Sequence, residues 1–155
     1  KLWPIIAISF LSAFFILMIS TQLHLTYASD DVLDNVVTVY KSASCGCCKK
    51  WVSHLEENGF KVKTVNSNNM VKIKDENGVP KGVRSCHTAT VGDYVIEGHV
   101  PAEDIKKLLA EKRLVAGLAV PGMPMGSPGM EGARKNNYSV SEFDKKGRAR
   151  TIANY

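Results

Sequence analysis

Three of the four cysteines in this 155-residue chain are clustered within four consecutive positions. They are Cys45, Cys47 and Cys48, and Gly46 between the first two permits a tight turn. Thiolate sulfur binds soft metals such as Cu(I), Zn(II) and the iron of iron–sulfur clusters, and it is also the nucleophile that attacks disulfides. We therefore expect the chemistry of the chain to centre on this cluster, together with the lone Cys86 further along the sequence.

The spacing of these cysteines is compatible with three kinds of chemistry. Cys45 and Cys48 have the Cys-x-x-Cys spacing of a thiol oxidoreductase. Two structural disulfides are a second interpretation, although the adjacent Cys47 and Cys48 would pair poorly because a disulfide between neighbours is strained. A soft metal site formed by all four thiolates is the third.

The third cysteine of the cluster favours the metal site. A dithiol oxidoreductase needs one attacking and one resolving thiolate, so Cys47 would invite mixed products, whereas a thiolate-metal site gains from each added sulfur. A Zn(II) site is usually built from two well-separated cysteine pairs. Three sulfurs on one turn are better suited to bridging several Cu(I) ions. We therefore predict a multinuclear Cu(I) site, with a thiol/copper oxidoreductase that uses Cys45-x-x-Cys48 as the alternative.

A second group of soft ligands lies in residues 117–132, which contain five glycines and three prolines. Three of the five methionines of the chain are in this segment, namely Met123, Met125 and Met130. The glycines and prolines exclude a helix or a central strand. We predict a Met-rich lid over the cysteine site, with the thioethers as secondary metal ligands or as apolar plugs of a groove.

Two histidines are further candidates for secondary ligands. His87 follows Cys86 directly, but on a regular strand the two side chains would point to opposite faces. His99 precedes an expected helix. A structural, hydrogen-bonded role is the alternative for both, and His54 is expected on the solvated surface of a helix.

The elements around these residues predict a mixed α/β domain in the order β-α-β-α-β-β-α. The cysteine cluster lies between the first strand and the first helix, where the helix dipole lowers thiol pKa values. Trp51 and Leu55 are predicted as core residues. The expected elements are a strand over residues 35–40, a helix over 49–58, a strand over 60–65, a helix over 68–75, a hairpin of 83–91 and 94–97, and a helix from Pro101 to about Leu114.

Three sequence blocks, VYKSASCGCCKKWVSHLEENGF, GVRSCHTATVGDYVIEGHVP and GLAVPGMPMGSPGME, resemble the CopG-like proteins, a family of exported bacterial metal-binding proteins linked to copper resistance. The resemblance spans roughly residues 36–131. It implies a thioredoxin-like fold, a central sheet with flanking helices, and copper bound at the cysteines. The family motif falls on Cys45, Cys47, Cys48 and Cys86.

The first 28 residues predict export. Residues 2–20 are apolar and uncharged, Lys1 precedes them, and Thr26-Tyr27-Ala28 offers a cleavage site. This N-terminal hydrophobic helix is expected to be a signal peptide or an uncleaved membrane anchor. Either alternative places the remaining chain in the periplasm or outside the cell, soluble after cleavage near Ala28 or tethered by residues 2–20.

Four of the five positive charges in the formal net charge of +5 come from the C-terminal segment, and the fifth is Lys1. Residues 29–131 carry thirteen basic and thirteen acidic side chains, whereas residues 132–155 carry six basic and two acidic ones. The neutral main part argues against nucleic acid as a partner. We predict a copper-binding domain over residues 29–131 and a hairpin or tail over 133–155, with copper ions and other exported copper-handling proteins as partners.

Overall fold

The computed structural model describes residues 36–155 of the chain. The signal peptide or anchor expected over residues 1–28 lies outside the described residues. No helix between residues 36 and 155 combines the length and the apolar character that a membrane span requires. The described residues form a seven-stranded sheet with three α-helices, which confirms the predicted α/β class.

The elements follow one another in the predicted order as far as the helix after the first hairpin. In chain order they are β1 (Val36–Lys41), α2 (Gly46–Glu57), β2 (Lys61–Asn66), α3 (Met70–Glu76), a 3₁₀ turn (Lys81–Val83), β3 (Thr88–Val91), β4 (Tyr94–Glu97), α4 (Ala102–Glu111), β5 (Gly117–Ala119), β6 (Ser139–Phe143) and β7 (Ala149–Asn154).

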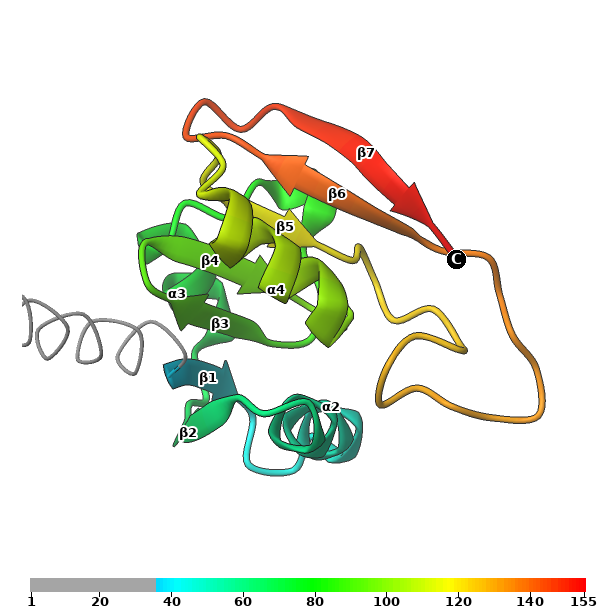
Figure 1. Ribbon diagram of the computed structural model, residues 1–155. Helices are drawn as coiled ribbons and strands as arrows, with labels where there is room; N and C mark the ends of the chain where they lie inside the picture. Colours follow the sequence, from blue (N-terminus) through cyan, green and yellow to red (C-terminus); the bar gives the residue numbers. More distant parts are fainter. Residues whose placement is uncertain (1–35) are drawn as a thin grey trace, which may run out of the picture. The chain divides into compact units, whose positions relative to one another are not determined.

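All seven strands belong to one sheet, in the order β2-β1-β3-β4-β5-β6-β7, so that β2 and β7 are the outer strands (Figure 1). β1 is parallel to β2 and β4 is parallel to β5, whereas the other neighbouring pairs are antiparallel. Parallel neighbours need a crossover connection, which α2 and α4 provide. The first crossover places the cysteine cluster between the carboxyl end of β1 and the start of α2.

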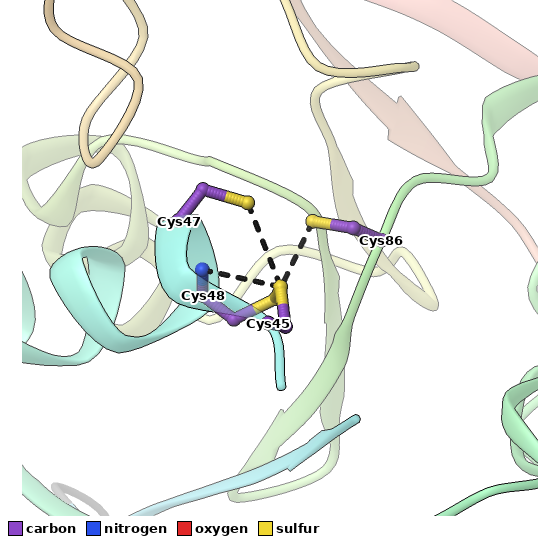
Figure 2. A group of neighbouring side chains, drawn as sticks. All are labelled: Cys45, Cys47, Cys48 and Cys86. Atoms are coloured by element: carbon purple, nitrogen blue, oxygen red, sulfur yellow. Dashed lines mark hydrogen bonds between the residues drawn. A yellow bond between two sulfur atoms is a disulfide. The ribbon is translucent and has the colours of Figure 1, made fainter. Parts of the chain in front are cut away.

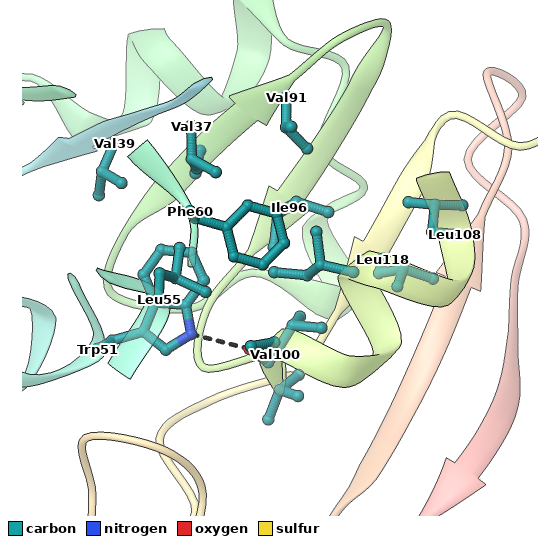
Figure 3. Packing of buried hydrophobic residues seen from close by; sticks show 14 of the residues in the cluster. Val37, Val39, Trp51, Leu55, Phe60, Val91, Ile96, Val100, Leu108 and Leu118 are labelled. Carbon is teal, nitrogen blue, oxygen red and sulfur yellow. Dashed lines mark hydrogen bonds between the residues drawn. The ribbon is translucent and has the colours of Figure 1, made fainter. Parts of the chain in front are cut away.

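The hydrophobic core attaches α2 and α4 to the sheet (Figure 3). Trp51 and Leu55 of α2 are fully buried, as predicted. The indole Nε1–H of Trp51 donates to the carbonyl oxygen of Val100 over 2.9 Å, which ties the helix to the segment before α4. Burying a side chain such as Leu55 contributes about 1.5–3 kcal/mol, so the core holds the start of α2 firmly in place.

The first strand of the hairpin predicted over residues 83–97 begins later than expected. β3 starts at Thr88, and residues 81–83 form a 3₁₀ turn instead of a strand. The backbone N–H of Ser85 donates to the side chain of Glu97, and a strand ladder does not include such bonds. Residues 84–87 therefore form an irregular segment before β3.

The exclusion of a central strand from residues 117–132 is wrong for their first three members. Gly117–Ala119 form β5, which lies in the sheet between β4 and β6. The prolines and the other glycines of this segment all follow Val120, so they interrupt only the loop. Gly117 permits the strand to approach β4, because a Cβ atom at this position would lie 1.8 Å from the carbonyl oxygen of Val95.

Strands β6 and β7 form a hairpin near the C-terminal end, within the residues 133–155 for which the sequence predicts a hairpin or a tail. Its turn contains Lys146 and Gly147, and the φ of Gly147 is +79°. The carboxylate of Asp144 accepts the backbone N–H groups of Lys146 and Arg148 over 2.9 and 3.0 Å. Because β6 pairs with β5, the hairpin extends the same sheet.

Candidate metal centre

The cysteine cluster lies at the amino-terminal end of α2 (Figure 2). Cys45 is the N-cap residue, and its Sγ accepts the backbone N–H of Cys48 over 3.3 Å. The same two residues form a disulfide, while Cys47 and Cys86 carry free thiols. The unpaired N–H groups and the dipole of the helix favour negative charge on sulfur at this position.

Cys86 completes a group of four sulfur atoms. Its Sγ lies 3.6 Å from Cys48 Sγ, and Cys47 Sγ lies 3.5 Å from Cys45 Sγ. All four Sγ atoms are within 4.8 Å of one another. The expectation that folding brings the lone later cysteine to the early three is therefore confirmed, whereas the assignment of the four as metal ligands stays a prediction.

The pairing of β1 with β3 brings Cys86 to the cluster. The two strands are antiparallel, and Tyr40 lies opposite Thr88. The residues just before Thr88 therefore lie beside the residues just after Tyr40, which lead into the cysteine loop. The register of β1 against β3 thus brings Cys86 next to the cysteine loop, although the two are far apart in the sequence.

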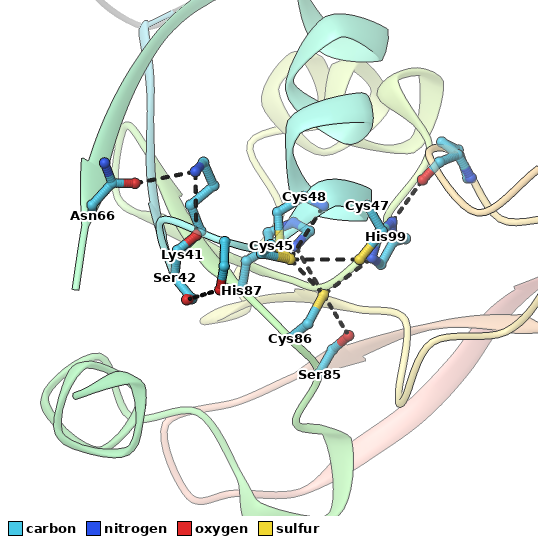
Figure 4. Close-up of a disulfide and its surroundings, with 12 residues drawn as sticks. Lys41, Ser42, Cys45, Cys47, Cys48, Asn66, Ser85, Cys86, His87 and His99 are labelled. Carbon is cyan, nitrogen blue, oxygen red and sulfur yellow. Dashed lines mark hydrogen bonds between the residues drawn. A yellow bond between two sulfur atoms is a disulfide. The ribbon is translucent and has the colours of Figure 1, made fainter. Parts of the chain in front are cut away.

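His87 and His99 are fully buried, and both contact the thiol of Cys86 (Figure 4). His99 Nε2 lies 3.1 Å and His87 Nδ1 lies 3.3 Å from Cys86 Sγ. The other ring nitrogen of His99, Nδ1, lies 2.7 Å from the carbonyl oxygen of Pro128. A carbonyl oxygen only accepts, so Nδ1 carries the hydrogen and Nε2 presents its lone pair to Cys86. A histidine held in this way is oriented as metal-ligating histidines are.

The expectation that His87 points away from Cys86 applies only to a regular strand. Both residues precede β3, and the irregular backbone lets both side chains reach the same place. The ring of His87 also packs against Trp51, with 4.3 Å between the ring centroids. Its Nε2 is buried and has no hydrogen-bond partner among residues 36–155.

Burial determines the protonation states of Cys86, His87 and His99. It raises the pKa of the Cys86 thiol to about 12, and the nearby Cys47 adds to the rise. Burial also lowers the pKa of His99, and it lowers the pKa of His87 well below the usual value. At neutral pH, Cys86 is therefore a neutral thiol beside two neutral imidazoles. A metal ion that binds to Cys86 must displace the thiol proton, so binding weakens as the pH falls.

Residues 121–132, which we call the Met loop, lie against the start of α2. Gly129 is a point of close approach, because a Cβ atom there would lie 2.8 Å from the carbonyl oxygen of Cys47 and 2.7 Å from the backbone nitrogen of Trp51. The φ of Gly129 is +81°. Together with the bond from His99 to Pro128, this contact places the backbone of the Met loop beside the site.

The methionines of the Met loop differ in exposure. Met123 is 54% exposed, whereas Met125 and Met130 are half-buried. The contacts that hold the loop to the site come from its backbone, through Pro128 and Gly129. The assignment of the three thioethers as a lid or as secondary ligands stays a prediction.

Three polar residues near the site have roles that their positions in the sequence do not indicate. His54, expected on the solvated surface, is half-buried, and its Nε2 accepts the backbone N–H of Ala102 at the first turn of α4 over 3.1 Å. Lys74 and Glu97 form a buried ion pair of 2.5 Å. Spacing carries no signal for these contacts, because only the tertiary fold brings their elements together.

One family model matches part of the chain. The family model described as "Protein of unknown function, DUF411" matches residues 83–130, which include Cys86 and most of the Met loop. No curated protein matches the chain.

Two similar solved structures are described as "Copper resistance protein copG- Form 2" and "Copper resistance protein copG- Form 1". Each is 47% identical to this chain over 77% of its length and has a TM-score of 0.73. The match covers 97% of the Form 2 chain and 96% of the Form 1 chain. At this identity and coverage, the similarity extends beyond a shared fold.

Proposed function

Because the chain belongs to the CopG family of copper resistance proteins, we propose that it binds copper as its cargo, as Cu(I), and stores it or passes it on. The observation that carries this proposal is the approach of four Sγ atoms to within 4.8 Å of one another. Soft thiolates at this spacing are suited to several Cu(I) ions that share sulfur bridges. The proposed ligands are Cys45, Cys47, Cys48 and Cys86.

Copper loading of all four sulfurs requires the disulfide to open. The Cys45–Cys48 disulfide takes up two electrons and two protons from a thiol reductant and becomes two thiols, which lose their protons when they bind metal. In the disulfide form only Cys47 and Cys86 retain free thiols. Oxidation would therefore remove two of the four cysteine donors and favour release of the metal.

Imidazole and thioether groups complete the proposed donor set. The lone pair on His99 Nε2 faces Cys86 Sγ at 3.1 Å, so His99 is suited to bind a copper ion that Cys86 also binds. His87 is the second imidazole within reach of Cys86. Met123, Met125 and Met130 are proposed as neutral soft ligands or as a lid that limits access to the site.

We also infer a thioredoxin-like arrangement and an exported location. The order strand, cysteine loop, helix, strand, helix, hairpin, helix from β1 to α4 supports the first inference. The apolar run of residues 2–20 in the sequence supports the second. Other exported copper-handling proteins are the expected donors or acceptors of the copper.

A titration of the reduced protein with Cu(I) tests the proposed function. We expect more than one Cu(I) per chain, and we expect Cys86→Ser to lower both the number of bound ions and the affinity. Ser44→Ala, which changes a neighbour of the cluster without removing sulfur, serves as the matched control. A stoichiometry of zero would exclude copper binding at this site, and a single ion would exclude the multinuclear form.

The disulfide favours a second candidate function, that of a thiol/copper oxidoreductase. Cys45 is partly exposed, whereas Cys48 is fully buried, so Cys45 is the sulfur that a partner can reach. In the reduced protein the two thiols can each give one electron to a Cu(II) ion. The products are two Cu(I) ions, the Cys45–Cys48 disulfide and two protons.

The variant Cys47→Ser separates the two functions. Cys47 is not part of the disulfide, so redox turnover through Cys45 and Cys48 should persist in this variant. Binding of several Cu(I) ions should instead collapse, because a bridging sulfur is lost. Loss of turnover with unchanged copper stoichiometry would contradict both assignments.

A further inference from the structure

Glu97 at the end of β4 is fully buried, and the proposed donor set does not include it. Its Oε1 accepts hydrogen bonds from Lys74 Nζ over 2.5 Å and from the backbone N–H of Ser85 over 2.6 Å. Its Oε2 accepts the hydroxyl of Thr88 over 2.7 Å. The carboxylate thus contacts residues on both sides of Cys86 in the chain.

A buried ion pair of this kind adds little to the free energy of unfolding, because both charges lose their hydration. Burial raises the pKa of Glu97, although Lys74 and the hydrogen bonds oppose the rise. Replacement of a buried ion pair by apolar residues of similar volume is often neutral or stabilising. The pair is better explained by the geometry that it imposes on the irregular segment of residues 84–87 and on Thr88 at the start of β3.

Other contacts show how tightly that segment is held. The backbone N–H of Gly98 donates to the carbonyl oxygen of His87 over 3.1 Å. Gly98 also lets the end of β4 approach Ser85, because a Cβ atom on Gly98 would lie 2.6 Å from Ser85 Cβ. The hydroxyl of Ser85 donates to the carbonyl oxygen of Gly122. Among these partners, Glu97 is the group that joins Ser85 to Thr88 directly.

We infer that Glu97 is a positioning residue, which holds Cys86 Sγ within 4.8 Å of the three sulfurs at the start of α2. The distance that it sets is the 3.6 Å between Cys86 Sγ and Cys48 Sγ. This inference rests on the proposed function and deepens it, since Cys86 is the one proposed cysteine ligand that lies far in the sequence from the cluster at the start of α2. Lys74 supports this arrangement, because its Nζ donates both to Glu97 Oε1 and to the hydroxyl oxygen of Thr88.

The test measures the position of Cys86 without copper. In the full chain with Cys45→Ser and Cys47→Ser, the remaining thiols are Cys48 and Cys86, and a serine at position 45 is itself a good N-cap residue. The equilibrium of their disulfide with glutathione reports the effective concentration of one thiol at the other. We expect Glu97→Gln to lower this effective concentration by about tenfold or more, because glutamine has one acceptor oxygen and cannot accept from both Ser85 and Thr88.

Glu142→Gln is the matched control. Glu142 is also a buried carboxylate with cationic partners, Arg113 at 3.2 Å and Arg150 at 2.6 Å, but it lies on β6, where it pairs with Leu118 and Arg150. We expect this variant to keep the effective concentration within about twofold. An unchanged value for Glu97→Gln, or an equal loss in both variants, would overturn the inference.

A second variant covers the case in which Glu97→Gln does not fold. The double variant Lys74→Met/Glu97→Leu removes both charges and preserves apolar volume, so the fold is expected to persist. The same tenfold loss is expected there, because no acceptor remains for the N–H of Ser85. A folded double variant with an undiminished effective concentration would overturn the inference.

Copper binding is measured separately in the protein with all four cysteines. Glu97→Gln should weaken Cu(I) binding against a competing chelator, whereas Glu142→Gln should not. If the unaltered protein binds no Cu(I), the proposed function fails, and the thiol equilibrium still decides the role of Glu97. If copper binds but the thiol equilibrium is insensitive to Glu97, the inference fails alone.

Discussion

His99 donates its Nδ1–H to the carbonyl oxygen of Pro128 over 2.7 Å. The same ring turns Nε2 toward Cys86 Sγ, 3.1 Å away. One side chain therefore connects the Met loop with the sulfur group. A rotation of the imidazole ring would therefore alter both the hydrogen bond to Pro128 and the direction of the Nε2 lone pair toward Cys86.

Replacement of His99 by alanine should loosen the Met loop. The carbonyl oxygen of Pro128 would lose its buried donor, and such a loss costs about 1–3 kcal/mol. Hydrogen exchange of the amides in residues 121–132 should accelerate by roughly tenfold or more. His54→Ala is the control, because His54 caps α4 and makes no such contact with the loop carbonyl. Unchanged exchange in the loop would show that Pro128 is held by other contacts.

Replacement of Gly129 by alanine should destabilise the loop more than the same change at Gly122. Both glycines have positive φ angles, so alanine is strained at both positions. A Cβ atom at position 129 would in addition collide with the backbone of Cys47 and Trp51, whereas one at position 122 would have no atom within 4 Å. We expect an additional loss of about 1–3 kcal/mol for Gly129→Ala, measured by urea unfolding. Equal losses would mean that the close approach to α2 does not exist in solution.

The disulfide should control copper uptake. Protein oxidised at Cys45 and Cys48 has two free thiols, so we expect it to bind at most one Cu(I), while the reduced protein binds several. Competition with a chromogenic Cu(I) chelator measures the stoichiometry of both forms, and thiol counting confirms the redox state of each sample. Equal stoichiometries would place the copper elsewhere in the chain.

The buried His87 should make folding less favourable in mild acid. Its pKa in the folded protein is well below 6.5, the ordinary value that it regains on unfolding, because burial disfavours the charged ring. Below pH 6.5 the unfolded chain therefore binds a proton that the folded chain does not. The free energy of unfolding should fall by up to about 1.4 kcal/mol per pH unit from this residue alone, until the pH reaches the folded-state pKa.

The variant His87→Phe isolates this contribution. Phenylalanine keeps an aromatic ring against Trp51 but does not titrate. His54 and His99, whose pKa values burial also lowers, are present in both proteins and cancel in the comparison. Urea unfolding at pH 7.5 and at pH 5.5 should show a weaker pH dependence for the variant. The same dependence in both proteins would contradict a neutral, buried His87.

Local patterns were sufficient to predict most elements of the fold. The apolar spacing of Trp51 and Leu55 indicates α2, and the turns at Gly92 and Gly147 mark the two hairpins. β5 could not be predicted in this way, because three residues have little strand preference of their own. Their conformation comes from the pairing with β4 on one side and β6 on the other.

The part of the candidate site that could be predicted from the sequence is the set of cysteine ligands. Thiolate is the charged soft ligand that this chain offers, and the clustering of three cysteines at the start of a helix pointed to one sulfur group. The contact of His99 depends on a loop carbonyl, and the contact of Glu97 depends on the sheet register. Residue spacing in the sequence predicts neither contact. The sequence predicts the position of Cys86 beside the cluster only through the resemblance to a thioredoxin-like fold. The physical cause is the pairing of Tyr40 with Thr88 in the sheet.

The outer strands of the sheet also bear on how the protein behaves at high concentration. β2 has one neighbour, and its exposed side chains include Lys61 and Lys63. At the opposite margin, the ladder of β6 and β7 is interrupted by a bulge between Val140 and Ser141. Lysines and bulges on margins hinder strand addition by another molecule. We therefore expect the sheet edges of residues 36–155 to add a further strand poorly, so that thiol and metal chemistry at the start of α2 can proceed without the sheets of two molecules joining.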